Sequence, residues 1–434
     1  MALISEAHKS YLITAKEFFI SATLTSGSAV LSLGFSAVSS IFLVRYLSTE
    51  DYARYTIAFG AYQTIQLLAD SGISNAVSNE ARSNWQSPDH VASTIKAGRM
   101  VRRPIISFVY LACFAFMIFF MMKHGASGSI ALVTSLLVII SSWMTNESSL
   151  ISIPLYFHQR IFSLQIAGVL SDFLRMALIF SAVFLLRYDY IAIGVFTAGF
   201  AFKYFILKHS SRGLIGKNKI VDPDTAQRIL KFVQNIRPVW IYACFSGSIT
   251  IFLASIFGKT FDLAAVGGLG RLGVLTGIGG FVFNSLITPR FCRVGSSGNL
   301  RVRFYQSYAA LLLINTLSVL PFVLFPVLGL KLLGEKYSHL QSELQISCFG
   351  SWIYGMYAGI YSLSIGRGHL VKPWLYLTLV VLWQLLLIST FNLHTLHGLL
   401  WIGALTHVPG VIGYFIASFN GLRREESKVE WNTI

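Results

Sequence analysis

The chain consists mainly of apolar stretches that are each long enough to cross a bilayer and are separated by short polar turns. A membrane-spanning helix needs about 20 mostly apolar residues. Of the 434 residues, 54% are hydrophobic and only 12% are charged, whereas a soluble domain carries about 25% charge. We therefore expect an all-α polytopic membrane protein and exclude a soluble or disordered chain. The sequence predicts twelve transmembrane helices, at 18–45, 52–80, 104–122, 129–153, 160–187, 190–208, 238–257, 262–289, 304–330, 340–365, 373–391 and 398–419.

Basic residues are concentrated in the turns on one side of these spans. With the N-terminus in the cytoplasm, most of the 34 Lys and Arg residues face the cytoplasm, as the positive-inside rule requires. The net charge of +16 therefore gives no reason to expect nucleic acid as a partner. We expect both termini in the cytoplasm and the first span as an uncleaved anchor. The cytoplasmic set includes Arg82, Lys96, Arg99, Arg102, Arg103, segment 208–237, Arg290, Arg293, Arg301, Arg303, Arg423, Arg424 and Lys428.

A polar segment after the sixth span divides the chain into two halves of six spans each. We expect an N-terminal lobe at 1–208, a cytoplasmic linker at 209–228, a C-terminal lobe at 229–420 and a cytoplasmic tail at 421–434. Related turns follow the first span of each half, because both contain an acidic residue and then a small residue that enters the next helix. Such related halves are typical of transporters.

Arg271 is the strongest candidate site residue among the charges inside the spans. A charge at the bilayer centre costs about 2.5–3.5 kcal/mol on insertion scales, so it marks a candidate functional site. Arg271 lies roughly 13 Å into its helix by the rise of 1.5 Å per residue, with no acid within one turn. It therefore needs a carboxylate from another helix or an anionic ligand. Arg45, at the end of the first span, is a weaker companion.

Three other charges in the spans have structural alternatives. Arg54 lies near the outer end of its helix and could extend to the interface. Asp172 and Arg175 are three residues apart and can pair along one helix. For this pair, a structural ion pair and a substrate site both remain open.

Polar side chains form one face on each of the first two spans. They could line a shared aqueous cavity or join neighbouring helices. We expect the cavity for the second span, because its acid and two amides are difficult to place against lipid, and leave both alternatives open for the first. The faces comprise Ser21, Thr25, Ser28, Ser32, Ser36 and Ser39 in the first span, and Thr56, Gln63, Gln66, Asp70 and Ser74 in the second.

The sequence contains no motif that indicates a cofactor, a metal site or a nucleotide-driven motor. The string Gly268-Leu-Gly-Arg-Leu-Gly273 matches a dinucleotide fingerprint but lies inside a span and follows no strand. The four cysteines lie far apart and lack metal-binding spacing. We expect no enzyme activity and no cofactor.

The first hairpin resembles that of a known family. The stretch Val44-Arg-Tyr-Leu-Ser-Thr-Glu-Asp-Tyr-Ala-Arg-Tyr55, followed by Asp70-Ser-Gly-Ile-Ser-Asn-Ala76, is similar to the polysaccharide transporter family. That family includes the O-antigen flippases of the multidrug/oligosaccharidyl-lipid/polysaccharide exporter superfamily. Ala265-Val-Gly267 is similar to the counterpart in the second half. Ala53 stands where a glycine is usual, and Leu269 where a tyrosine is usual.

The resemblance implies two six-helix bundles around a central cavity, alternating access and a place in the bacterial inner membrane. The implied substrate is an undecaprenyl-diphosphate oligosaccharide, as used in lipopolysaccharide biosynthesis, and the implied partners are membrane lipids and other polysaccharide-assembly proteins. We expect the substrate to be bound by Arg271, Arg45, Arg54, Gln63, Gln66, Asp70, Asp172 and Arg175. A multidrug exporter of the same superfamily and a membrane-embedded glycan polymerase are the alternatives.

Overall fold

The computed structural model describes residues 27–183, 186, 188–216, 222–292, 300–367, 369 and 371–432. The described chain is built of helices, with one isolated bridge between Arg212 and Ile215. This confirms the prediction of a helical polytopic membrane protein. The helices are Gly27–Tyr46, α2 Thr49–Asp70, α3 Ile73–Ala81, α4 Pro88–Lys123, α5 Gly128–Phe157, α6 Ile161–Leu178, α8 Asp189–Ser210, α9 Pro223–Phe257, α10 Thr260–Leu286, α11 Thr288–Cys292, α12 Leu300–Leu324, α13 Pro326–Leu333, α14 Gln341–Gly366, α15 Pro373–Thr390, α16 Leu396–Leu405 and α17 Val408–Asn432, with short single-turn helices between some of them.

The predicted spans coincide with helices over most of their described length. Eight described helices are long and apolar enough to cross a membrane, and two shorter apolar segments lie at 246–257 and 374–390. Residues 18–26 of the first predicted span lie outside the described residues. The helix α4 has 36 residues and is about 54 Å long, so it extends well beyond a hydrocarbon core of about 30 Å.

The prediction of one continuous span at 52–80 is wrong, because the helix breaks between α2 and α3. Ser71 and Gly72 both adopt left-handed backbone conformations, with φ of 43° and 77°. Ser71 still donates its backbone N–H to the carbonyl of Leu67, so it caps α2. Left-handed residues end a helix because they cannot continue its hydrogen-bond ladder.

Prolines mark interruptions in two other predicted spans. Pro326 begins α13 after a break at Phe325, and Pro409 lies in the first turn of α17 just after the break between α16 and α17. Pro321 is accommodated inside α12. A proline at a helix start removes no hydrogen bond of the helix, whereas a proline inside a helix removes one. Pro326 and Pro409 therefore begin new helices without the loss of a hydrogen bond.

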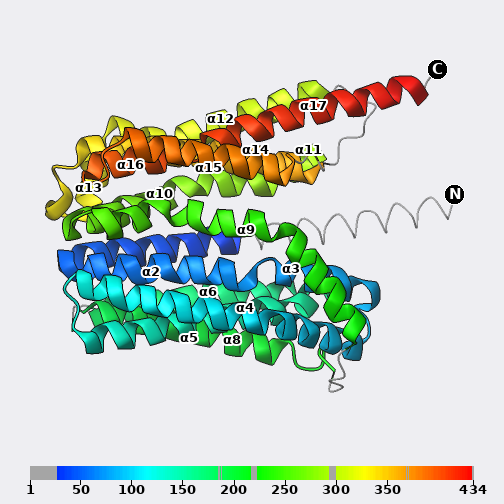
Figure 1. The fold of residues 1–434 in the computed structure, drawn as a ribbon, viewed down its shortest axis with the longest axis horizontal. Helices are drawn as coiled ribbons and strands as arrows, with labels where there is room; N and C mark the ends of the chain where they lie inside the picture. The colour runs from blue at the N-terminus through cyan, green and yellow to red at the C-terminus, as the bar shows by residue number, and fades with distance from the viewer. Residues whose placement is uncertain are drawn as a thin grey trace.

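The helices run roughly parallel in two groups (Figure 1). The helices α2, α4, α5, α6 and α8 lie together, and α10 and α12–α17 lie on the other side of α9. We call the end that carries α13 the α13 end and the opposite end, with α3 and α11, the α11 end. The predicted lobe boundary at 209–228 stays a prediction.

The two groups share their apolar core mainly towards the α13 end. One buried cluster includes Leu43 and Ile65 from the first group and Leu263 and Leu399 from the second. Towards the α11 end, the second group has its own cluster around Phe304, separate from that of α3 and α4. Apolar burial therefore joins the groups at one end and leaves them separate at the other.

Polar contacts also join the groups at the α13 end. Lys123 Nζ donates to the carbonyls of Ser255 and Ile256, at 3.3 and 2.5 Å, so the end of α4 is bound to the end of α9. The neighbouring imidazole of His124 contacts the Ser255 carbonyl and the Thr260 hydroxyl, both at 3.2 Å. From the second group, Lys336 Nζ donates to the carbonyl of Leu47 at 2.7 Å.

Candidate functional site

A cavity of about 210 Å³ lies between the two groups of helices. The helix Gly27–Tyr46, α2, α6, α8 and the residues that follow α6 supply its walls from the first half, and α10 closes it from the second. Its lining combines guanidinium groups, serine hydroxyls and aromatic rings. The lining residues are Ser36, Ser39, Ser40, Leu43, Tyr55, Phe59, Tyr62, Arg175, Ile179, Phe196, Phe200 and Arg271.

Arg271 is buried in this cavity and lies over aromatic rings. Its Cζ atom is 3.9 Å from the ring centroid of Phe59 and 5.6 Å from that of Tyr55. These cation–π contacts partly offset the loss of hydration. Among the described residues, no carboxylate forms an ion pair with Arg271, so its positive charge stays uncompensated.

A glycine one turn before Arg271 sets its position. At Gly267, α10 approaches α2 so closely that a Cβ atom would meet the side chain of Thr56. Arg271 lies four residues further on the same face of α10. It therefore extends over Tyr55 and Phe59, which flank Thr56 on the facing helix.

Arg175 brings a second guanidinium to the cavity together with a carboxylate. Its Nη2 atom lies 2.8 Å from Asp172 Oδ1, which confirms that the two residues pair along α6. The Cζ atom of Arg175 also lies 4.7 Å from the ring centroid of Phe196. Arg175 lines the cavity, whereas its partner Asp172 lies beside it and is not part of the lining. Together, the ionised side chains of Arg271, Arg175 and Asp172 carry a net positive formal charge.

Serine hydroxyl groups form another part of the lining. Ser39 and Ser40 donate to the carbonyls of Phe35 and Ser36 in their own helix, at 2.6 and 2.7 Å. Their oxygen lone pairs remain available as acceptors. Ser36 and Ser39 belong to the predicted polar face of the first span, whereas Ser21 and Thr25 lie outside the described residues.

Two of the predicted arginines lie away from the cavity. Arg54 forms ion pairs with Asp51 and, at 3.2 Å, with Asp189, so both its neighbours are carboxylates. Arg45 is exposed at the α13 end and lies next to Gly334. A Cβ atom added to Gly334 would lie 3.6 Å from the Arg45 side chain. Neither residue lines the cavity.

Asp70 is neutralised by an arginine that the sequence alone does not connect to it. Arg102 Nη2 lies 2.5 Å from Asp70 Oδ1, and Arg102 Nη1 donates to the carbonyl of Asn146 at 2.7 Å. Ser74 also donates to Asp70. Only 1% of the Arg102 side chain is exposed, so this network joins α2, α4 and α5 as a buried structural pair.

Gln63 and Gln66 lie outside the cavity but on its side of α2. They follow Phe59 by four and seven residues, so all three share one face of the helix. Gln63 is exposed and Gln66 is half-buried. The predicted amides therefore lie along α2 from the cavity towards the α11 end.

Sequence reasoning missed the aromatic lining. Tyr55, Phe59 and Tyr62 recur every three or four residues along α2, and Phe196 and Phe200 face them from α8. This spacing was a readable signal, but in a membrane helix it is also the pattern of ordinary packing. In the described part of the chain, no group of three or more His, Cys, Asp or Glu side chains is placed to hold a metal ion.

Comparison with known proteins gives a fold and no sequence relative. No family model and no curated protein sequence matches the chain. The structure is similar to an inward-facing MATE multidrug transporter of the MOP superfamily, with a TM-score of 0.66 and 13% identity over 91% of this chain and 95% of that one. It is also similar to the lipid II flippase MurJ in an inward closed conformation, with a TM-score of 0.67 and 14% identity over 92% of this chain and 89% of that one.

A eukaryotic MATE transporter, AtDTX14, shares the fold as well, with a TM-score of 0.58 and 12% identity over 95% of this chain and 98% of that one. The chain therefore shares its fold with these transporters and this flippase along almost its whole length. The similar structures are described as transporters and a flippase. The likeness does not distinguish a flippase from a multidrug exporter.

Proposed function

We propose that the protein is a flippase that moves an undecaprenyl-diphosphate-linked oligosaccharide from the inner to the outer leaflet of a bacterial inner membrane. The observation that carries this proposal is the buried, carboxylate-free guanidinium of Arg271 in a cavity between the two helix groups. A buried charge without a partner is costly, and a diphosphate would supply the missing negative charge through charge-assisted hydrogen bonds. The substrate class follows from the family resemblance of the first hairpin.

The other lining groups suit the sugar part of such a substrate. The hydroxyls of Ser36, Ser39 and Ser40 can replace water around a sugar, and the rings of Phe196 and Phe200 offer flat apolar faces. Gln63 and Gln66 extend this polar surface along α2. The polyprenyl chain would stay in the lipid.

The size of the cavity limits which part of the substrate it would hold in this conformation. Pockets that enclose a drug-sized ligand measure about 300–1,000 Å³, and this one measures about 210 Å³. It would therefore hold the phosphate groups, while the glycan requires the helix groups to separate. We propose that residues 1–208 and 229–420 act as two lobes that rock about the shared packing at the α13 end, with 209–228 as the cytoplasmic linker and 421–434 as the tail.

The positive-inside rule supports a cytoplasmic α11 end, because Arg82, Lys96 and Arg103 lie there. In that orientation the structure is closed on the outer side, where Lys123 and Lys336 join the groups. The substrate would then enter from the inner leaflet. Both termini would lie in the cytoplasm.

Multidrug export is the second candidate function. The observation that favours it is the position of the Asp172 carboxylate. This carboxylate lies beside the cavity and could attract a cationic drug, and the aromatic walls could stack on one. For a flippase, Asp172→Asn should preserve glycan transport, because both guanidinium groups remain. For a cation exporter, the same change should abolish transport.

The deciding experiment reconstitutes the purified protein in vesicles with a fluorescent undecaprenyl-diphosphate oligosaccharide and, separately, with a cationic dye. The flippase proposal expects the glycan to become accessible on the opposite leaflet and the dye gradient to stay unchanged. A neutral polyprenyl glycoside with the same sugar is the control and should stay in place. Dye transport without glycan transport would establish the exporter instead.

A further inference from the structure

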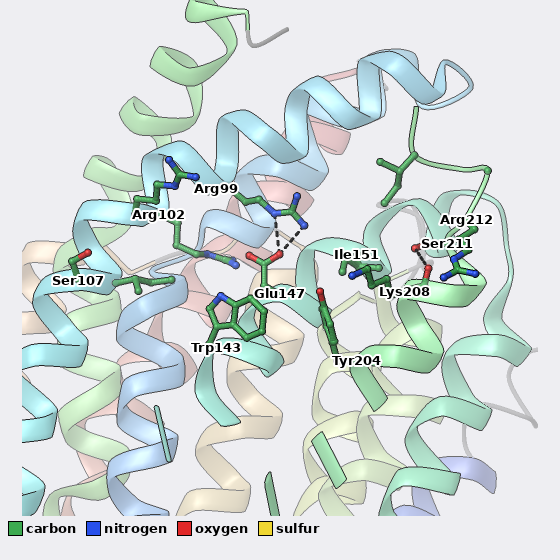
Figure 2. A pocket seen from close by; sticks show the side chains of 14 residues that line it. Arg99, Arg102, Ser107, Trp143, Glu147, Ile151, Tyr204, Lys208, Ser211 and Arg212 are labelled. Atoms are coloured by element: carbon green, nitrogen blue, oxygen red, sulfur yellow. Dashed lines mark hydrogen bonds and ion pairs between the residues drawn. The ribbon is translucent and has the colours of Figure 1, made fainter. Parts of the chain in front are cut away.

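A second and larger cavity, of about 820 Å³, lies within the first helix group near the α11 end. The helix α5 forms its floor through Trp143, Glu147 and Ile151, which recur every four residues. Helix α4 forms one wall, and the end of α8 with the turn after it forms the other. Figure 2 shows Glu147 and Trp143 between Arg99 on one side and Tyr204 and Lys208 on the other. This cavity shares no lining residue with the Arg271 cavity.

The larger cavity carries an excess of positive charge. Five of its lining residues are basic and one is acidic, and the acidic residue, Glu147, pairs with Arg99 at 2.7 Å. The pairing of Arg102 with Asp70 neutralises a second cation. Three cations remain without a carboxylate partner among the described residues, so the lining favours an anion. They are Arg103, Lys208 and Arg212.

A buried donor at the edge of this cavity is also unsatisfied. The Nε atom of Arg102 is buried and has no hydrogen-bond partner in the protein. Such a buried donor costs free energy unless a ligand or water accepts from it. The lining thus combines surplus charge with hydrogen-bonding capacity that the protein itself leaves unused.

The cavity lies where the head groups of a bilayer leaflet would be. Its α4 residues, from Arg99 to Ser107, cross the start of the apolar stretch predicted at 104–122. Trp143 and Tyr204, with ring centroids 5.8 Å apart, add the amphipathic aromatic pair typical of the membrane interface. The Nζ atom of Lys208 lies 5.5 Å from the Tyr204 ring centroid.

An exposed apolar track leads from the cavity towards the bilayer centre. On α5, Ile140 and Leu136 lie one and two turns beyond Trp143, and both are exposed. On α4, Phe108 and Leu111 are 74% and 71% exposed. A free inorganic anion makes no use of such a track, whereas acyl chains cover it.

We infer that this cavity binds the phosphate head group of an anionic phospholipid, with its acyl chains along the exposed surface of α4 and α5. Basic pockets between transmembrane helices on the cytoplasmic side are the general form of such sites. The phosphodiester oxygens accept from Arg103, Lys208 and Arg212. The lipid thereby joins α4 to the end of α8 within one lobe.

Native mass spectrometry of the protein in a neutral detergent tests this site. Phosphatidylglycerol and phosphatidylcholine with identical acyl chains are titrated separately, and phosphatidylglycerol should bind at least about tenfold more tightly. The double variant Arg103→Gln/Lys208→Gln removes two cations and should weaken phosphatidylglycerol binding by about 30-fold. The matched control, Arg82→Gln/Lys231→Gln, removes two exposed cations at the same end of the molecule and should bind as the native protein does.

Three outcomes of the binding titrations would overturn the inference. The first is equal binding of the two lipids, and the second is equal binding of phosphatidylglycerol by the two double variants. The third is displacement of phosphatidylglycerol by inorganic phosphate at a concentration similar to that of the lipid, because this would assign the cavity to a free anion. A photoactivatable phosphatidylglycerol on the native protein avoids any folding defect of the variants. Its label should appear in peptides of α4, α5 or α8, and labelling confined to other helices contradicts the site.

Discussion

At the scale of a single residue, the buried guanidinium of Arg271 is the most distinctive feature of the cavity that it lines. This guanidinium lies over the rings of Phe59 and Tyr55, which partly offset its lost hydration without supplying a negative charge. An arginine of this kind can present two parallel donors to a phosphate, which a lysine cannot do.

We expect Arg271→Ala to abolish surface polysaccharide in cells and to weaken binding of the diphosphate-linked glycan by about 10- to 100-fold, the value of charged hydrogen bonds. Arg271→Lys should rescue transport in part, because the charge remains. Protein level in the membrane serves as the control and should stay unchanged. Normal polysaccharide in the alanine variant would remove Arg271 from the site.

Asp70 differs from Arg271, because the buried Arg102 compensates its charge. Asp70→Asn leaves the fully buried Arg102 without its carboxylate, so we expect a loss of about 3–5 kcal/mol in unfolding free energy. Thermal unfolding in detergent measures this loss. Glu147→Gln is the matched control, since its partner Arg99 is 43% exposed, and it should cost about 1 kcal/mol or less. Equal effects of the two substitutions would show that burial does not govern them.

The sequence predicted part of the site residue by residue. Depth within a span singled out Arg271, and spacing predicted the Asp172–Arg175 pair, because both depend on local order along one helix. Arg102, which pairs with Asp70, is 32 residues away, and Asp189, the second partner of Arg54, is 135 residues away. No local pattern encodes such contacts. The aromatic lining went unnoticed because core packing produces the same spacing.

At the scale of elements, the contact between α2 and α10 determines where the cavity forms. A Cβ atom on Gly267 would meet Thr56, whose branched side chain has little freedom to move. We expect Gly267→Ala to push α10 away from α2, to cost about 1–3 kcal/mol and to reduce transport. Gly270→Ala should be neutral, since a Cβ atom there meets nothing within 4 Å. A stable, fully active Gly267→Ala variant would contradict this account.

Helix positions were readable from sequence more reliably than helix interruptions. Apolar length predicts a span, and the breaks near 326 and 409 lie at prolines, which are visible in the sequence. The break at Ser71 and Gly72 was missed because glycine is common inside membrane helices and does not by itself end one. Its left-handed backbone depends on how α3 packs against α4 and α9, which is tertiary information.

At the scale of the whole molecule, His124 makes the closure at the α13 end sensitive to pH. Burial, aided by the charge of Lys123 and opposed by the hydrogen bond to Ser255, lowers the pKa of His124 below its ordinary value of 6.5. The unfolded chain therefore binds a proton at a higher pH than the folded chain. The stability from neutral His124 is complete above about pH 6.5 and falls as the pH drops below that value.

We accordingly expect the thermal midpoint of the native protein to fall as the pH is lowered from 7 to 5.5. The midpoint of the His124→Gln variant should fall less steeply, because glutamine does not titrate but still offers a hydrogen-bond donor and an acceptor. Parallel curves for the two proteins would exclude His124 as the titrating group.

The interruption at Ser71 and Gly72 has a mechanical consequence. The helix α2, which precedes the interruption, carries the aromatic wall of the Arg271 cavity. The helix α3, which follows it, belongs to a different apolar cluster with α4 and α9. We expect Ser71 and Gly72 to act as a hinge between these two parts of the chain. In that case α2 tilts to admit a bulky sugar while the apolar cluster of α3, α4 and α9 stays packed throughout the cycle.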